Sequence, residues 1–125
     1  MNLCLSDYGE LFVIDLDQVV YLQADDHYTH VYYASEAHFM VPFGLSCLEE
    51  SINDITHQQP FLLRIGRKYI INVKKVFHIN VGKQIAVLTN DVGKNISLHI
   101  SQAALQSLID KFKNEEKTII NTIQS

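Results

Sequence analysis

Basic side chains are concentrated in one stretch of the sequence. Residues 1–60 contain ten acidic side chains and no Lys or Arg, whereas residues 61–113 contain nine basic and two acidic ones. Residues 114–125 add one negative charge, so balances of −10, +7 and −1 give the formal net charge of −4. Half of the ten basic side chains interrupt an apolar run: Arg64, Arg67, Lys68, Lys74 and Lys75. A strand-like segment that carries cations is typical of a surface that faces a polyanion.

The centre of this segment reads Arg64-Ile65-Gly66-Arg67-Lys68-Tyr69. A continuous strand would place Arg67 on the same face as Ile65 and Tyr69, where an unpaired guanidinium is very costly to bury. A turn or bulge at Gly66 removes this conflict, because glycine tolerates the backbone angles required. Arg67 and Lys68 then project from a loop, where Arg can donate two hydrogen bonds to guanine and Lys can bind phosphate. A solvated run of charge is the alternative.

A second polar segment, Asp25-Asp26-His27-Tyr28-Thr29-His30, combines two carboxylates with two imidazoles. Such groups could bind a metal ion or act as acid and base. Metal ligands must converge on one point, however, and consecutive Asp residues in a loop more often face water. His27 and His30 could instead donate hydrogen bonds to bases or phosphates, although the two Asp residues argue against close phosphate contact there.

Further polar side chains surround the last expected strand and the start of the last expected helix: Lys94, Asn95, Ser101 and Gln102. The free N–H groups at a helix N-terminus favour a phosphate, and a glutamine amide can bind adenine through N6 and N7. An ordinary capped helix with a polar surface is the simpler explanation of the same residues.

The elements that must position these residues are short. In the first half, runs of β-branched and aromatic residues predict strands at 11–16, 19–24, 28–34 and 37–43. The period then changes, because Leu48, Ile52 and Ile55 are spaced as one face of a helix. Ser46 is the expected N-cap of this helix, with Glu49 completing a capping box, and the helix should end before Pro60.

Strands are expected again at 61–65, 69–73, 76–81, 84–88 and 95–100, between turn signals such as Val81-Gly82-Lys83 and Asn90-Asp91-Val92-Gly93. Ser101 can cap a last helix, whose apolar face is Leu105, Leu108, Ile109 and Phe112. The tyrosines lie mostly on expected strands, in the core or at sheet edges. These elements predict a mainly β (α+β) fold of small antiparallel sheets with two short helices.

Length and composition exclude several classes of protein. We expect one domain over residues 1–113, followed by a polar tail, 114–125, that is either disordered or a helical extension carrying Ile119, Ile120 and Ile123. No run approaches the ~20 apolar residues of a membrane span, and the N-terminus does not resemble a signal peptide. Cys4 and Cys47 lack metal-ligand spacing and are expected to be reduced thiols of a cytoplasmic protein. Since no motif for zinc, nucleotide or hydrolase chemistry is found, we expect no enzyme activity and no cofactor.

Four blocks in order resemble the LytTR family, the DNA-binding output domain of bacterial LytR/AlgR-type response regulators. The segment 20–24 followed by His27-Tyr28-Thr29 is similar to the family's YIEA and NYT motifs. Leu45, Leu48 and Glu49 resemble its SLxxLE helix. The segment 64–72, Arg64-Ile65-Gly66-Arg67-Lys68-Tyr69-Ile70-Ile71-Asn72, is similar to RxHRSYxVN, the most specific block. Ile100-Ser101-Gln102 resembles the VSR block, so the match spans about residues 10–113.

The resemblance implies a transcription regulator in which loops, rather than a recognition helix, enter the major groove of double-stranded DNA. The family's base-reading positions fall on His27 or His30, on Arg67 with Lys68, and on Gln102. We expect two copies to bind repeated half-sites. The full set of expected DNA-contacting residues adds phosphate and helix-end contacts: His27, His30, Arg67, Lys68, Lys74, Lys75, Lys94, Asn95, Ser101 and Gln102.

The chain departs from the family pattern at three of these places, because Gly66, Lys68 and Gln102 stand where the family has His, Ser and Arg. Its sequence preference should therefore differ from that of relatives. No receiver domain is expected, so control would come from abundance, a regulatory protein partner or a ligand. The acidic first half supports an alternative, an interaction module that keeps the fold and binds a protein partner through its acidic face. A metal-dependent enzyme at Asp25, Asp26, His27 and His30 is the weakest of the three hypotheses.

Overall fold

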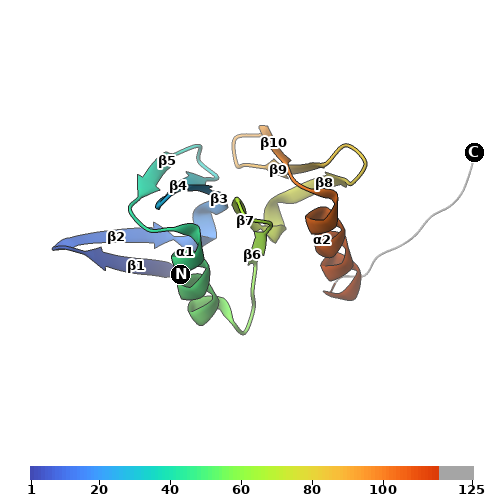
Figure 1. Ribbon diagram of the computed structural model, residues 1–125. Helices are drawn as coiled ribbons and strands as arrows, with labels where there is room; N and C mark the ends of the chain where they lie inside the picture. Colours follow the sequence, from blue (N-terminus) through green and yellow to red (C-terminus); the bar gives the residue numbers. More distant parts are fainter. Residues whose placement is uncertain (116–125) are drawn as a thin grey trace, which may run out of the picture.

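The computed structural model describes residues 1–115 of the chain (Figure 1). These residues form ten strands, arranged in three antiparallel sheets, and two α-helices. The strands are β1 (Asn2–Asp7), β2 (Glu10–Asp15), β3 (Val19–Asp25), β4 (Tyr28–Tyr33), β5 (His38–Val41), β6 (Leu62–Ile65), β7 (Tyr69–Asn72), β8 (Val76–Asn80), β9 (Ile85–Thr89) and β10 (Asn95–His99). The helices are α1 (Leu45–Thr56) and α2 (Gln102–Glu115). Short 3₁₀ turns at Leu16–Gln18 and Val73–Lys75 lead into β3 and β8.

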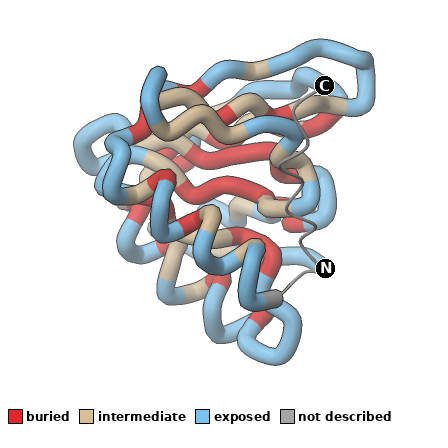
Figure 2. The backbone as a smooth tube through the Cα atoms, turned by 90° about the vertical axis from the view of Figure 1, so that its right-hand side faces the viewer, coloured by how far each residue is buried: buried red, intermediate tan, exposed pale blue. Residues whose placement is uncertain are grey.

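A five-stranded sheet with the order β5-β4-β3-β7-β6 lies at the centre of the fold and is covered on both faces. Neighbouring residues of β3 and β7 point to opposite faces, as in any strand, so Leu22 and Ile70 enter one core while Tyr21 and Ile71 enter the other. This two-sided burial explains why β3 begins with an unbroken apolar run rather than an alternating one. Figure 2 shows the buried segments running through the middle of the molecule.

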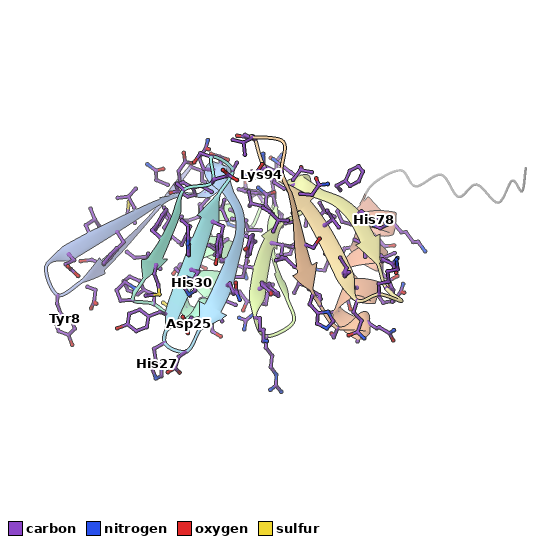
Figure 3. All side chains as sticks on the ribbon, turned by 90° about the horizontal axis from the view of Figure 1, so that it is seen from above. Tyr8, Asp25, His27, His30, His78 and Lys94 are labelled. Atoms are coloured by element: carbon purple, nitrogen blue, oxygen red, sulfur yellow. The ribbon has the colours of Figure 1, made fainter. Side chains whose placement is uncertain are left out.

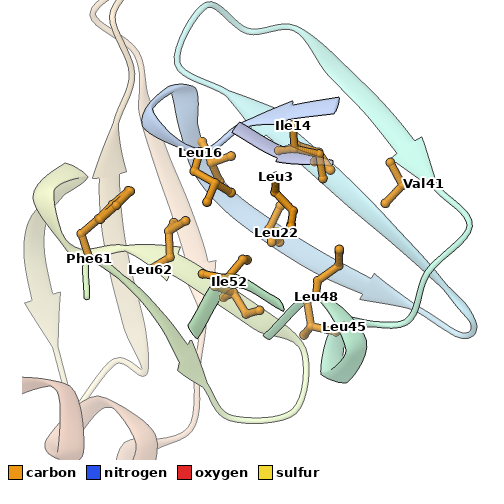
Figure 4. Packing of buried hydrophobic residues seen from close by; sticks show 13 residues of the cluster. Leu3, Ile14, Leu16, Leu22, Val41, Leu45, Leu48, Ile52, Phe61 and Leu62 are labelled. Atoms are coloured by element: carbon orange, nitrogen blue, oxygen red, sulfur yellow. The ribbon is translucent and has the colours of Figure 1, made fainter. Parts of the chain in front are cut away.

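The first core lies between this sheet, α1 and the β1–β2 hairpin (Figure 4). Its fully buried side chains include Ile14, Leu16, Leu22, Leu48 and Ile52. The second core lies on the other face, where the three-stranded sheet β10-β9-β8 and α2 supply Ala86, Leu88, Leu98, Leu105 and Leu108. The mainly β architecture with two helices, expected from the sequence, is therefore confirmed.

Several local expectations are also confirmed. The backbone turns at Gly66, where φ is +68°, between β6 and β7. Ser101 precedes α2, and its Oγ accepts a hydrogen bond from the N–H of Ala104 at 3.3 Å. Leu105 and Leu108 are buried, and Phe112 packs against the same core. The tail segment with Ile119, Ile120 and Ile123 lies outside the described residues.

The expected N-cap of the first helix, Ser46, is wrong by two residues. Helix α1 begins at Leu45 with Gly44 as its N-cap and no side-chain capping bond. Ser46 and Glu49 lie inside the helix, where both are acceptors for the guanidinium of Arg64 instead of forming a capping box. Ile55, expected on the apolar face, is 39 % exposed, and Thr56 takes the buried place because its Oγ1 donates to the Ile52 carbonyl oxygen at 2.9 Å.

Strand β1 was not expected from the sequence. It pairs with β2 from Asn2↔Asp15 to Asp7↔Glu10, and Leu3 from this strand enters the first core. The two strands are joined at Tyr8 and Gly9, both with positive φ, as a two-residue hairpin turn requires. In the described part of the chain, neither helix is long and apolar enough to cross a membrane.

Candidate nucleic-acid interface

Three connections lie together at one end of the sheets. The β3–β4 turn holds Asp26 and His27, and the β6–β7 turn holds residues 66–68. The two turns are adjacent because β3 pairs with β7, and the N–H of Ala24 donates to the Lys68 carbonyl oxygen at 2.8 Å. The third connection, from β10 into α2, shares a hollow of about 370 Å³ with the second. We call residues 26–27, 66–68 and 100–102 the three-turn edge.

The β6–β7 turn is held from below by Arg64. Its Nε donates to the carbonyl oxygen of Gly66 at 3.0 Å, and its Nη2 donates to that of Arg67 at 2.9 Å. Hydrogen bonds from a charged donor are stronger than neutral ones. Arg64 therefore positions the turn and is not a free cation of the basic segment, although the sequence groups it with Arg67 and Lys68.

Arg67 and Lys68 are the exposed cations of the three-turn edge. Within the described part of the chain, neither side chain has a hydrogen bond or an ion pair that would hold it against the protein. An arginine whose backbone is fixed and whose side chain is free can reach a partner, and its guanidinium can donate two parallel hydrogen bonds. The structure thus leaves the donors of both side chains available for an external ligand.

His27 and His30, which the sequence offers together, have different surroundings. The His27 side chain is 91 % exposed at the tip of the β3–β4 turn, with its Nε2 3.7 Å from Asp26 Oδ1. His30 lies on β4, where its Nε2 is 2.9 Å from Asp25 Oδ2 and its Nδ1 is 2.9 Å from His38 Nε2. Since both ring nitrogens of His30 are engaged, His27 is the better placed of the two histidines for an external contact (Figure 3).

These carboxylates and imidazoles do not gather as a metal site would require. Among the described residues, no group of three or more His, Cys, Asp or Glu side chains converges on a point. Cys4 and Cys47 are free and exposed. The described side chains thus offer no three-ligand centre from these residue types.

At the third connection, Ser101 and Gln102 are both exposed at the start of α2. The Ser101 hydroxyl oxygen is already used in capping the helix, whereas Gln102 extends from the first helical residue. His99 also lines the hollow beside Arg67, and sequence reasoning did not single it out. The signal was the alternation of β10, in which Leu98 is buried, so that His99 must point outward.

The remaining expected contacts lie at the other end of the strands. Asn95 begins β10 and Lys94 precedes it, and Figure 3 shows Lys94 opposite the end that carries His27. Lys94 Nζ is 3.0 Å from Glu36 Oε1, and Lys75 Nζ is 3.2 Å from Asp91 Oδ1. Lys74 lies over the ring of Phe61, 4.9 Å from its centre. The structure therefore does not bring these residues together with Arg67.

Tyr21, Tyr32 and His38 form a stack on the same face of the central sheet as His30. Tyr21 and Tyr32 are parallel with ring centres 4.3 Å apart, and Tyr32 and His38 are parallel at 4.2 Å. Burial raises the pKa of the Tyr21 hydroxyl well above its usual range, and the neighbouring Tyr32 adds to the rise. Tyr21 is buried, Tyr32 is partly buried and His38 is exposed, so the stack runs from the core to the surface. Of the tyrosines near the three-turn edge, Tyr28, 47 % exposed, is the more accessible.

Comparisons with known proteins identify the family and the fold. The family model for the LytTr DNA-binding domain matches residues 9–113. Among solved structures, the chain is similar to the LytTr DNA-binding domain of a protein described as a methyl-accepting/DNA response regulator from Bacillus cereus. That likeness has a TM-score of 0.57 at 22 % identity, covering 90 % of this chain and 95 % of the other, and it shows the fold. No match was found among curated proteins. Because the family model covers most of the chain, the chain belongs to the LytTR family of DNA-binding domains.

Proposed function

We propose that the chain is a sequence-specific regulator of transcription that inserts the three-turn edge into the major groove of double-stranded DNA. The observation that carries this proposal is the exposure of Arg67 and Lys68, with unpaired side chains, on a turn that Arg64 holds in place. A fixed backbone with free donors limits the entropy lost when a base is bound. The major groove is the groove in which all four base pairs differ in their donors and acceptors.

Each residue of the edge has a role that suits its chemistry. Arg67 donates two hydrogen bonds to guanine O6 and N7, and Lys68 contacts a phosphate. Gln102 binds adenine N6 and N7 from the start of α2, and His27 donates to a base or phosphate from the β3–β4 turn. The N–H groups in the first turn of α2 that Ser101 does not cap add a favourable place for a phosphate.

The lysines at the opposite end are not part of this contact. Lys75 and Lys94 are paired with Asp91 and Glu36, and they lie across the length of the strands from Arg67. They contribute to attraction at a distance, which salt screens within about 10 Å at moderate ionic strength. This separation supplies a matched control, because a cation can be removed at either end.

The test is a selection from a randomised duplex pool at two salt concentrations, followed by sequencing of the retained DNA. The proposal predicts a repeated motif whose recovery weakens with salt, as expected when two copies occupy half-sites. Arg67→Ala should lose discrimination at one base, whereas Lys94→Gln should retain the motif. A folded protein that enriches no sequence would contradict the proposal.

A protein-binding role is the second candidate, and the β1–β2 hairpin favours it. Figure 1 shows this hairpin extending from the body of the molecule. Its exposed apolar side chains are Tyr8, Leu11 and Val13, in an acidic segment with Asp7 and Glu10. Such a surface suits a partner that presents basic and apolar side chains. Salt-insensitive DNA binding, or none, together with loss of a partner in Leu11→Ser, would favour this role.

A further inference from the structure

Two carboxylates, one on the three-turn edge and one next to it, lie near the cations of this edge. Asp25 ends β3 and Asp26 follows it in the turn, and the backbone of the preceding residue, Ala24, is bonded to Lys68. With neutral histidines, the charges of Asp25 and Asp26 offset those of Arg67 and Lys68. A DNA phosphate approaching this end therefore meets two negative charges as well as two positive ones, which weakens attraction.

Each of these carboxylates has an imidazole beside it. His30 Nε2 is 2.9 Å from Asp25 Oδ2, and His27 Nε2 is 3.7 Å from Asp26 Oδ1. Histidine is the side chain that ordinarily changes charge between pH 5 and 8. Protonation of both imidazoles would change the charge of the two pairs from −2 to zero and leave Arg67 and Lys68 unopposed.

The inner pair can take up a proton without any movement of its heavy atoms. An ionised carboxylate only accepts hydrogen bonds, so His30 Nε2 must carry a hydrogen in either charge state. In the neutral form, His30 Nδ1 accepts from His38 Nε2 across the 2.9 Å bond. In the protonated form, the hydrogen of His38 Nε2 has moved to His30 Nδ1 and the incoming proton is on His38 Nδ1, so His30 Nδ1 donates to His38 Nε2 and the same heavy-atom geometry serves both states.

We infer that DNA binding by the three-turn edge is coupled to proton uptake at His30 and His27, which neutralises Asp25 and Asp26 as the phosphates approach. The inference rests on the proposed function and adds its regulation. A phosphate nearby favours the imidazolium, and by linkage a lower pH then strengthens DNA binding by the same factor. The segment Asp25-Asp26-His27 thereby acts as the pH-sensitive part of the interface.

The charged and titratable groups around the two histidine–aspartate pairs also favour tighter DNA binding at lower pH. Those that lie next to them are Asp25 and Asp26 from β3 and its turn, Tyr32 from β4, His38 from β5, and Arg67 with Lys68 from the β6–β7 turn. Beyond His38, Glu36 and Lys94 line a second hollow together with Tyr32 and His38, and their charges neutralise each other. The imidazoles thus face a balanced set of charges, to which a DNA phosphate adds a negative one.

The test is the dissociation constant of a fluorescently labelled duplex, both one of mixed sequence and one retained in the selection, at fixed ionic strength near pH 6 and near pH 8. A unit charge a few ångströms away in water changes affinity about fivefold, so partial uptake of two protons predicts binding about tenfold tighter at the lower pH. The double variant His27→Gln with His30→Gln should bind with nearly the same affinity at both pH values, while its amide at position 30 can still donate to Asp25.

Two further variants separate this effect from a general gain of positive charge. Asp25→Asn with Asp26→Asn should bind tightly at both pH values, because the repulsion is removed without a proton. His57→Gln, at the far end of α1 and hydrogen-bonded to the Asp54 carbonyl oxygen, should keep the full pH dependence. Circular dichroism at both pH values checks that each variant is folded.

The outcomes distinguish failure of the proposed function from failure of the inferred pH dependence. Folded protein that binds neither duplex at any pH would overturn the proposed function together with this inference. DNA binding that does not change between the two pH values would overturn the inference alone. A pH dependence that persists in full in the double histidine variant would also overturn it, because the proton would then bind elsewhere.

Discussion

Arg64 and Glu49 form an ion pair, with Arg64 Nη1 3.1 Å from Glu49 Oε1, that ties β6 to α1. The same guanidinium reaches the carbonyl oxygens of Gly66 and Arg67, so one side chain connects a helix, a strand and the turn that carries the proposed base contact. The finding separates two arginines that the sequence places three positions apart. Arg64 acts inward, on the backbone, and Arg67 acts outward.

This relationship predicts that Arg64 affects DNA binding indirectly. Arg64→Ala removes several charge-assisted hydrogen bonds and should lower the free energy of unfolding by about 1–3 kcal/mol. It should also weaken DNA binding, because the turn is no longer held. Arg64→Lys should recover little of either, since an ammonium cannot donate to both carbonyls and the carboxylate in this fork geometry. Urea unfolding and DNA titration measure the two effects.

Glu49→Gln is the control for Arg64. Glu49 is 36 % exposed, so loss of its charge should cost less than about 1 kcal/mol, and the contacts of Arg64 to the turn remain. Wild-type stability and wild-type DNA affinity in Arg64→Lys would show that the hydrogen bonds from Arg64 to the turn contribute to neither property.

The turn itself predicts a contrast between two glycines. Gly66 has φ +68°, a conformation that side chains with a Cβ rarely adopt, so Gly66→Ala should destabilise the fold by about 1 kcal/mol and shift the turn. Gly44 lies at the N-cap of α1 with negative φ, and an added Cβ would meet nothing within 4 Å. Because alanine is a poorer N-cap than glycine, Gly44→Ala should cost about 0.5 kcal/mol, less than Gly66→Ala. Equal losses in thermal unfolding would contradict the assignment of strain to Gly66.

Base reading and phosphate contact predict different consequences for Arg67 and Lys68. Arg67→Ala should cost roughly 1–3 kcal/mol of binding on the preferred DNA and relax specificity at one position. Lys68→Gln should weaken binding almost equally on all sequences and reduce the salt slope by about one. Affinities on matched and mismatched duplexes, each over a series of salt concentrations, separate the two. Loss of affinity for every sequence alike in Arg67→Ala would exclude base reading by Arg67.

The same measurements on Lys94→Gln use the opposite end of the strands as the reference. Because its side chain is paired with Glu36 and lies away from the three-turn edge, the change should affect affinity by less than about twofold at moderate salt. A loss as large as that in Lys68→Gln would place Lys94 in direct contact with DNA and enlarge the interface beyond the three turns.

Much of the fold was predictable from the sequence because the local rules and the tertiary structure agree. The apolar runs that became β3, β4 and β7 are rich in β-branched and aromatic residues, and Gly66 signals the turn that frees Arg67. Strand β1 was less visible because its turn, Tyr8-Gly9, lacks the Asn or Asp that usually marks a two-residue hairpin. The start of α1 was misplaced because Ser46 and Glu49 have the spacing of a capping box, and only the fold brings Arg64 to both.

The candidate site was predictable in its residues but not in its extent. Counting charges groups Arg67 with Lys74, yet the four residues of β7 between them carry the chain about 13 Å along the sheet. Strand β10 likewise separates Lys94 from Ser101. Which cations share an end depends on strand register, and register is decided by pairing between distant segments. The network of Asp25, His30 and His38 joins three strands, so no local pattern could have shown it.

Asn72 gives a prediction about stability that is independent of DNA. It is 2 % exposed at the end of β7, where its Nδ2 donates to the Val19 carbonyl oxygen and its Oδ1 accepts from the Lys74 N–H, both at 2.9 Å. Asn72→Ala leaves a buried carbonyl and a backbone N–H without partners and should cost roughly 2–4 kcal/mol in urea unfolding. Asn80 provides the matched control, since its Oδ1 accepts from the Lys83 N–H at 2.9 Å in an exposed turn, where water can replace the lost bond. Asn80→Ala should cost less than about 1 kcal/mol. If both changes cost the same, the link between β7 and β3 would not depend on the buried amide.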